Sequence, residues 1–144
     1  MAEFNSIQEM MQNCAAQAVD CAQQKFGFSL DYSEASLRDL ETILASVAVS
    51  LPAGDKDAVE REVKLWGAYF GEVALRQFGG AWELVVYPGG AVAVPALVMG
   101  GSQLYPLMKL YRRLTMGEAE NVWLYYQKIR PRLSPVYPID DLTR

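Results

Sequence analysis

Apolar residues recur every three or four positions through the first half of the chain, the spacing that gathers them on one face of an α-helix. This pattern predicts a first helix over residues 6–25 and a second that starts with Ser33 as its cap and closes before Pro52. A third helix is expected from Asp55 or Asp57 to about residue 78. Because its second half carries almost no charge, we expect this third helix to be buried on more than one side.

After residue 80 the pattern changes to short runs rich in β-branched and aromatic residues. The runs WELVVY and AVAVPAL flank a Pro-Gly-Gly turn, which is typical of a β-hairpin, here over about residues 82–98. Pro95 has no N–H to offer a sheet, so the second run is expected to break there or to lie at an edge. The sheet is expected to have two strands, with room for a third.

Two more helices and a proline-rich tail complete the predicted elements. One helix starts at Pro106 and ends before Gly117, and the other begins at Glu118 and buries one apolar face. The order is therefore ααα-ββ-αα, a single α+β domain over residues 1–130 with helices packed on a small antiparallel sheet. Three prolines predict an extended C-terminal tail over residues 131–144.

The 144-residue chain contains no histidine, which removes the usual general base at neutral pH and every His-ligated metal site. Cys14 and Cys21 lie about 10 Å apart on one predicted helix, too far for a disulfide. The sequence has no glycine-rich phosphate loop and no calcium-loop spacing. We therefore expect no metal, no cofactor and no catalytic function.

The charge pattern bears on partners and on location. A net charge of −4 without a block of Lys or Arg argues against nucleic acid and favours a basic protein partner. The uncharged stretch over residues 84–108 is interrupted by glycines and prolines, so we do not expect it to enter a membrane. The first residues do not resemble a secretory signal, which predicts a cytoplasmic protein.

One carboxylate, Glu72, stands among apolar residues and glycines of the third predicted helix, in the stretch WGAYFGEVALRQFGGAW. A buried carboxylate needs a partner, and Arg76, four residues on, is expected to form a structural ion pair with it. A hydrolase that uses Glu72 or Glu83 as its acid is the less favoured alternative. Asp39 and Glu41 of the second helix are expected on a solvated face.

Three stretches of the chain resemble known sequences. They are FSLDYSEASLRDLE at residues 28–41, WGAYFGEVALRQFGGAW at residues 66–82, and QLYPLMKLYRRLTMGE at residues 103–118. Through the motifs LDYSxxSL, GAYxGEVxxRxxGGxW and PLxKxxxRxxxG, the chain resembles a group of small bacterial domains of uncharacterised function, over roughly residues 26–130. The resemblance implies architectural roles, with Gly67 and Gly71 for close packing, and it implies no activity. In its small size, acidity and lack of histidine the chain is also similar to bacterial immunity proteins, which neutralise toxins.

Candidate partner contacts lie in the last predicted helix and in the loop after the hairpin. Trp123 and Leu124 are expected off the buried face, so that Trp123 either anchors a partner or is covered by the tail. The expected function is a non-catalytic bacterial binding protein, most concretely an immunity-type protein, and the alternative is a housekeeping or regulatory domain that forms a homodimer. The full set of candidate contacts is Trp123, Leu124, Glu118, Glu120, Met99 and Tyr105.

Overall fold

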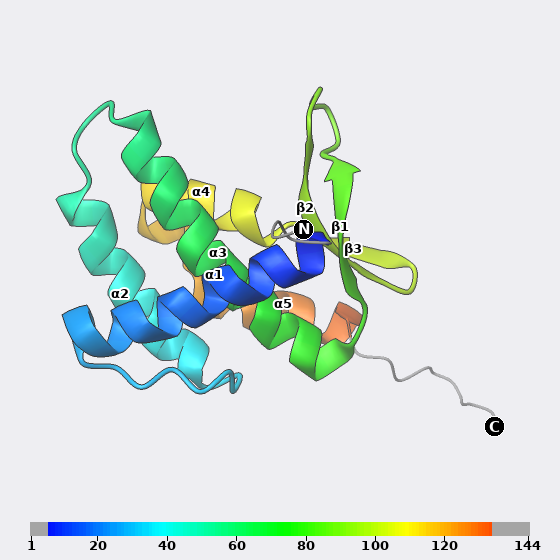
Figure 1. Ribbon diagram of the computed structural model, residues 1–144, viewed down its shortest axis with the longest axis horizontal. Helices are drawn as coiled ribbons and strands as arrows, with labels where there is room; N and C mark the ends of the chain where they lie inside the picture. The colour runs from blue at the N-terminus through cyan, green and yellow to red at the C-terminus, as the bar shows by residue number, and fades with distance from the viewer. Residues whose placement is uncertain (1–5, 134–144) are drawn as a thin grey trace.

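A computed structural model describes residues 6–133 and shows an α+β architecture (Figure 1). Three helices precede a three-stranded antiparallel sheet and two follow it, in the predicted order. The helices are α1 (Ile7–Cys21), α2 (Ser36–Ser50), α3 (Lys56–Phe78), α4 (Pro106–Met116) and α5 (Val122–Leu133), with a π-helical turn η1 (Ala22–Phe26) after α1 and a 3-10 turn η2 (Glu118–Glu120) before α5. The strands are β1 (Ala81–Val86), β2 (Ala93–Met99) and β3 (Ser102–Leu104).

Helix α3 lies at the centre of the fold, and α1 crosses it in Figure 1. The side chain of Asp55 caps its first turn by accepting a hydrogen bond from the N–H of Ala58 at 3.0 Å. From Trp66 to Ala74 every residue is buried, so the prediction of a helix covered on more than one side is confirmed. The helix ends at Gly79, whose φ of 80° lies in the region that favours glycine.

The first two helices differ in how they begin. Ser6 caps α1, because its hydroxyl accepts a hydrogen bond from the N–H of Glu9 at 3.2 Å. Ser33 does not cap α2 directly; its hydroxyl accepts from the N–H of Ser36 at 3.1 Å and closes a separate turn before the helix. Helix α2 therefore starts at Ser36, later than the sequence pattern predicts.

The hairpin forms where it was predicted, and the sheet has the third strand for which the sequence left room. The strand order is β1-β2-β3, and both neighbouring pairs are antiparallel. Pro95 lies in the central strand opposite Leu84 of β1. Strand β2 is central and continuous through Pro95, so the prediction of a break or an edge strand is wrong. Proline is tolerated here because β3 pairs only with Leu97–Met99, and within residues 6–133 no strand lies beside Pro95 on that side.

Helix α5 continues through Pro131 to Leu133. The first residues of the predicted extended tail are therefore helical, because a proline near the end of a helix removes a single backbone hydrogen bond without stopping its last turn. The rest of that tail, residues 134–144, lies outside the described residues.

Only part of the hairpin belongs to the core. At its base, Trp82 and Leu97 face each other across the two strands and are buried. Farther along β1, Leu84 and Val86 are 60% and 55% exposed. Figure 1 shows the far half of the hairpin extending beyond the helices. The fold thus combines a buried junction between α3 and β1 with an apolar hairpin end that its own helices do not cover.

Candidate functional site

Glu72 is 4% exposed, and its carboxylate bonds to a residue of the neighbouring strand. Its Oε2 accepts a hydrogen bond from the indole Nε1–H of Trp82 at 2.8 Å. The predicted ion pair with Arg76 is wrong, since the Arg76 guanidinium lies over the ring of Tyr32, 3.6 Å from the ring centre. The turn after α3 folds β1 back along the helix, which gives Glu72 a partner that sequence spacing within the helix does not suggest.

Two glycines allow neighbouring elements to approach α3 closely. A Cβ atom added at Gly71 would overlap the indole ring of Trp82. A Cβ atom added at Gly67 would lie 3.0 Å from the Leu107 side chain of α4. The predicted close-packing role of both glycines is therefore confirmed.

The hydroxyl of Tyr69 joins the turn before α2 to the middle of α3. It accepts a hydrogen bond from the backbone N–H of Tyr32 at 2.8 Å and shares one with the Ser36 hydroxyl at 2.6 Å. Tyr32 has a φ of 66°, a strained value for an aromatic residue that these contacts hold in place. The segments LDYSEASL and GAYFGEV thus form one structural unit, and their residues have architectural roles.

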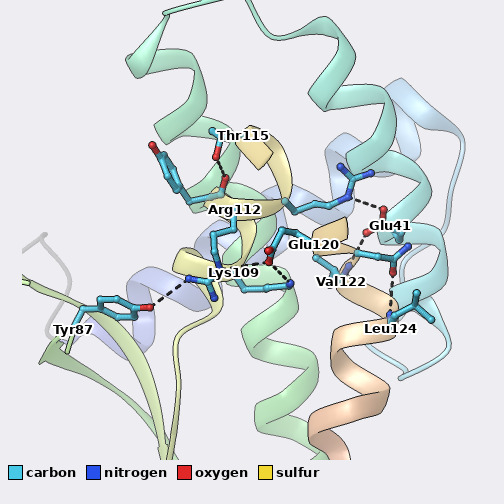
Figure 2. Close-up of polar contacts among 11 residues, drawn as sticks. Glu41, Tyr87, Lys109, Arg112, Thr115, Glu120, Val122 and Leu124 are labelled. Atoms are coloured by element: carbon cyan, nitrogen blue, oxygen red, sulfur yellow. Dashed lines mark hydrogen bonds and ion pairs between the residues drawn. The ribbon is translucent and has the colours of Figure 1, made fainter. Parts of the chain in front are cut away.

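Glu41 is a structural residue, contrary to the expected solvated position. Its Oε2 accepts a hydrogen bond from Nε of the buried Arg113 at 2.7 Å, and its Oε1 accepts from the backbone N–H of Val122 at 2.8 Å. Figure 2 shows these two contacts converging on the carboxylate from α4 and α5. A single side chain of α2 therefore holds the last two helices together.

Glu120, predicted to contact a partner, is instead engaged within the chain. Its Oε1 lies 2.8 Å from Lys109 Nζ and 3.5 Å from Arg112 Nε (Figure 2). The hydrogen bond from Lys109 is the main cause that holds the pKa of this carboxyl below its ordinary value. Lys109 itself lies over the ring of Tyr125 at 4.5 Å, so both partners are fixed by their surroundings.

The other predicted contacts on the last helix are more accessible. Leu124 is 61% exposed, and Glu118 is exposed in η2. Trp123 is half-buried, and the Arg38 guanidinium lies 5.2 Å from its ring centre. Trp123 and Arg130 help to line a shallow pocket of about 340 Å³. Whether residues 134–144 cover Trp123 lies outside the described residues.

The loop after the hairpin does not present the two residues predicted there. Met99 is 9% exposed and belongs to the core, because it is the last residue of β2 and packs inward. Tyr105 is half-buried, stacks edge-on against Tyr87 with ring centres 4.9 Å apart, and donates its hydroxyl proton to Gln103 at 2.7 Å. Met99 is therefore unavailable to a partner, and Tyr105 is largely occupied by its own chain.

A large apolar groove lies beside the hairpin, at a place that the sequence pattern did not indicate. Its volume is about 640 Å³, within the range of binding sites for ligands and side chains. We call it the hairpin groove. Its walls come from α1 (Ile7, Met10, Met11), α3 (Glu60, Val63, Lys64), the hairpin (Leu84, Val94, Pro95) and α4 (Leu107, Met108, Tyr111).

The mouth of the hairpin groove is apolar and exposed. Leu84 is 60% exposed and Tyr111 is 45% exposed, and they belong to different elements, β1 and α4. Glu60 and Lys64, one helical turn apart on α3, are its charged lining residues. Sequence periodicity places Leu84 and Tyr111 on separate elements, so their proximity could not be predicted from it.

The two carboxylates of the hydrolase alternative do not form a pair. Glu83 follows Trp82 on β1, and neighbouring strand residues point to opposite faces, so Glu83 points away from the side chain that holds Glu72. Among residues 6–133 no group of three Cys, Asp or Glu side chains has a metal-binding arrangement. In the same part of the chain no helix is both long and apolar enough to span a membrane. Comparisons of the chain with family models, curated proteins and solved structures gave no match.

Proposed function

We propose that this chain is a non-catalytic protein-binding domain and that its hairpin groove receives apolar side chains of a partner protein. The observation that supports this proposal is a groove of about 640 Å³ with an apolar lining, two of whose residues, Leu84 and Tyr111, are exposed. Burial of apolar surface away from water lowers the free energy, and exposed apolar surface beside a groove is typical of an interaction site.

The lining of the hairpin groove suits a protein partner. The half-buried Met10 and Met108 provide flexible, polarisable side chains, which adapt to the shape of a bound segment. Glu60 and Lys64 provide charged groups beside an apolar floor, the arrangement of an interface core with a polar rim. An amphipathic segment with apolar anchors and one or two charged neighbours matches this surface.

The polar interior of the domain supports a role without catalysis. The carboxylates of Glu72 and Glu41 bond to Trp82 and to Arg113, and the buried Lys109 bonds to Glu120. These contacts hold helices and strands together and none of them lines the hairpin groove. Groups that carry the fold in this way are poorly placed to exchange protons with a substrate.

The biological setting stays a prediction. We propose a bacterial, cytoplasmic protein whose partner is a toxin or effector that it neutralises by binding, as the immunity-type character of the sequence suggests. Co-expression of the partner with and without this chain tests this role, and a partner that is equally harmful in both cases contradicts it.

The binding proposal itself is tested by photo-crosslinking in the native cell. A photoreactive amino acid replaces Tyr111 in the hairpin groove, and a matched version replaces Leu124, which is exposed on α5. We expect one discrete adduct with another protein from position 111, which is lost when Met108→Glu places a charge in the groove. The partner is then purified and its affinity for the wild type and for M108E is measured.

Three outcomes contradict the assignment. An adduct from position 124 alone moves the binding surface to α5 and restores the original expectation for Trp123. A small apolar molecule that co-purifies with the wild type, without any protein adduct, makes the hairpin groove a ligand site. Equal affinity of the wild type and M108E for the partner excludes the groove as its contact.

A further inference from the structure

Strand β1 is an outer strand of the sheet, so among residues 6–133 no strand lies beside one of its two edges. At its start, the backbone N–H of Trp82 donates to the side-chain Oε1 of Gln8 on α1 at 3.1 Å. This N–H therefore points away from β2. Because backbone groups of alternate residues in an antiparallel strand point to the same side, those of Leu84 and Val86 also point away from β2.

Pro95 supports the same orientation independently. It lies directly opposite Leu84 in the β1–β2 pair. A pair that exchanges two hydrogen bonds would need an N–H from Pro95, which has none. Leu84 and Pro95 must form a non-hydrogen-bonded pair, so the N–H and C=O of Leu84 face the free edge.

At Trp82 the outer edge of β1 is covered by Gln8 of α1, but beyond that residue the strand carries little of the usual protection against pairing. Monomeric proteins commonly place Lys, Pro or a bulge on an exposed edge strand. Residues 81–87 contain no Lys, Arg or Pro, and Glu83 is their single charged residue. Since Leu84 and Val86 also expose apolar side chains, this strand combines unpaired backbone groups with apolar surface.

We propose that β1 pairs with β1 of a second copy of this chain, antiparallel and about a two-fold axis at Val85. In this register Leu84 exchanges hydrogen bonds with Val86 of the second copy, and Val86 does so with its Leu84. The two three-stranded sheets become one continuous sheet. This assembly uses the backbone edge of β1 and goes beyond the binding role of the hairpin groove.

The backbone N–H groups that are free to donate favour this register over the two registers whose two-fold axis is shifted by one residue. A two-fold axis at Leu84 would require the N–H of Trp82, which already donates to Gln8. A two-fold axis at Val86 would place Leu84 opposite Pro88, which has no N–H. With the axis at Val85, Trp82 lies opposite Pro88 of the second copy, and neither residue has an N–H left to donate there.

The charges of the hairpin agree with the same register. Glu83 lies opposite Tyr87 of the second copy, so the two Glu83 carboxylates are not paired with each other. The hydroxyl of Tyr87 accepts a hydrogen bond from Arg112 at 3.3 Å (Figure 2). The cross-strand neighbour of Glu83 therefore lies beside the Arg112 guanidinium, which is also 3.5 Å from Glu120. Opposite charges across the interface favour association.

The first experiment locates the two-fold axis with cysteines in full-length protein. Val85→Cys is made with Cys14→Ser and Cys21→Ser, and Glu83→Cys in the same background is the matched control. Cα atoms of a non-hydrogen-bonded pair are about 4.5 Å apart, which suits a disulfide, whereas two copies of residue 83 would be offset by about 13 Å. We expect V85C to form the covalent dimer at least about tenfold faster than E83C under mild oxidation.

The second experiment measures the mass of the protein by sedimentation equilibrium from low to high micromolar concentration. We expect the wild type to be a dimer and Val86→Lys to be a monomer, because lysine blocks an edge strand and Val86 does not line the hairpin groove. Val49→Lys, an exposed change on α2, should remain a dimer. Far-UV circular dichroism verifies that both variants are folded; if V86K is not, the cysteine experiment decides.

A wild type that is monomeric at every concentration overturns the proposal. A dimer that persists in folded V86K excludes β1 as its interface, and faster crosslinking of E83C than of V85C excludes the register. These results are independent of the partner-binding proposal, since a photo-adduct from position 111 with a different protein can occur with a monomer. An adduct of two copies of this chain from position 111 would instead place self-association in the hairpin groove.

Discussion

The junction between α3 and β1 differs from the far end of the hairpin in whether its side chains and polar groups are buried and bonded. At the junction, Glu72 and the indole of Trp82 satisfy each other and are buried. At the hairpin end, two residues farther along the same strand, Leu84 is exposed and its backbone groups face the outer edge of β1, where residues 6–133 supply no strand. The buried core therefore ends within β1, and the part of the strand from Leu84 to Val86 is exposed to contacts with other molecules.

Polar residues of this chain are of two kinds: those that join helices and strands, and those that line the hairpin groove. Residues whose side chains join helices and strands, such as Glu41 and Tyr69, are required by the fold. Residues that line the hairpin groove, such as Glu60 and Lys64, have a different role, because the fold does not depend on burying them. Substitutions should therefore change stability in the first group and binding in the second.

The largest loss of stability is expected for Glu41→Ala. This change leaves the guanidinium of Arg113, 2% exposed, without its carboxylate, and leaves the N–H of Val122 without an acceptor. Breaking a buried ion pair by removing one partner costs about 3–5 kcal/mol of unfolding free energy. Urea denaturation measures the change, and Glu118→Ala, which removes an exposed carboxylate, is the matched control. Equal stability of E41A and E118A would show that Glu41 is not structural.

A smaller loss is expected for Gly71→Ala in the buried junction. The added Cβ would overlap the ring of Trp82, and overpacking of this kind costs about 1–3 kcal/mol. The control is Gly101→Ala in the turn after β2, where an added Cβ has no neighbour within 4 Å. Thermal unfolding followed by the fluorescence of Trp82 and the other tryptophans distinguishes the two. A G71A protein as stable as G101A would contradict the close packing of α3 and β1.

The smallest effect is expected from the titration of Glu120. Its pKa is lower in the folded protein than the ordinary value of 4.5, chiefly through the hydrogen bond from Lys109. The stability from this contact is therefore fully present above pH 4.5 and is lost as the pH falls through the folded value. Urea denaturation at several pH values should show the wild type more stable than Glu120→Gln near neutral pH. A difference that stays constant in acid would contradict this linkage.

The order of helices and strands could be predicted from the sequence because it depends on local patterns. The glycines after α3, the Pro-Gly-Gly turn and the capping Asp55 act over a few neighbouring residues. The start of α2 was misplaced because the Ser33 hydroxyl caps a turn just before the helix, and a sequence pattern does not distinguish these two uses of serine.

The candidate contacts could be predicted only in part, for a physical reason. Helical spacing places Leu124 off the buried face, and it is exposed. Met99 and Glu120 were misassigned because their surroundings come from other elements, the core under β2 and the basic residues of α4. Burial of a loop-adjacent residue and the choice of an ion-pair partner are decided by tertiary packing.

By itself, the sequence determined an α+β domain with a glycine-rich, buried third helix, because periodicity and turn chemistry are local properties of the chain. Only the tertiary structure decided that Glu72 bonds to Trp82, that Glu41 joins three helices, and that four elements meet to form the hairpin groove. These features depend on residues far apart in the sequence, whose distances are set when the helices and the hairpin pack together.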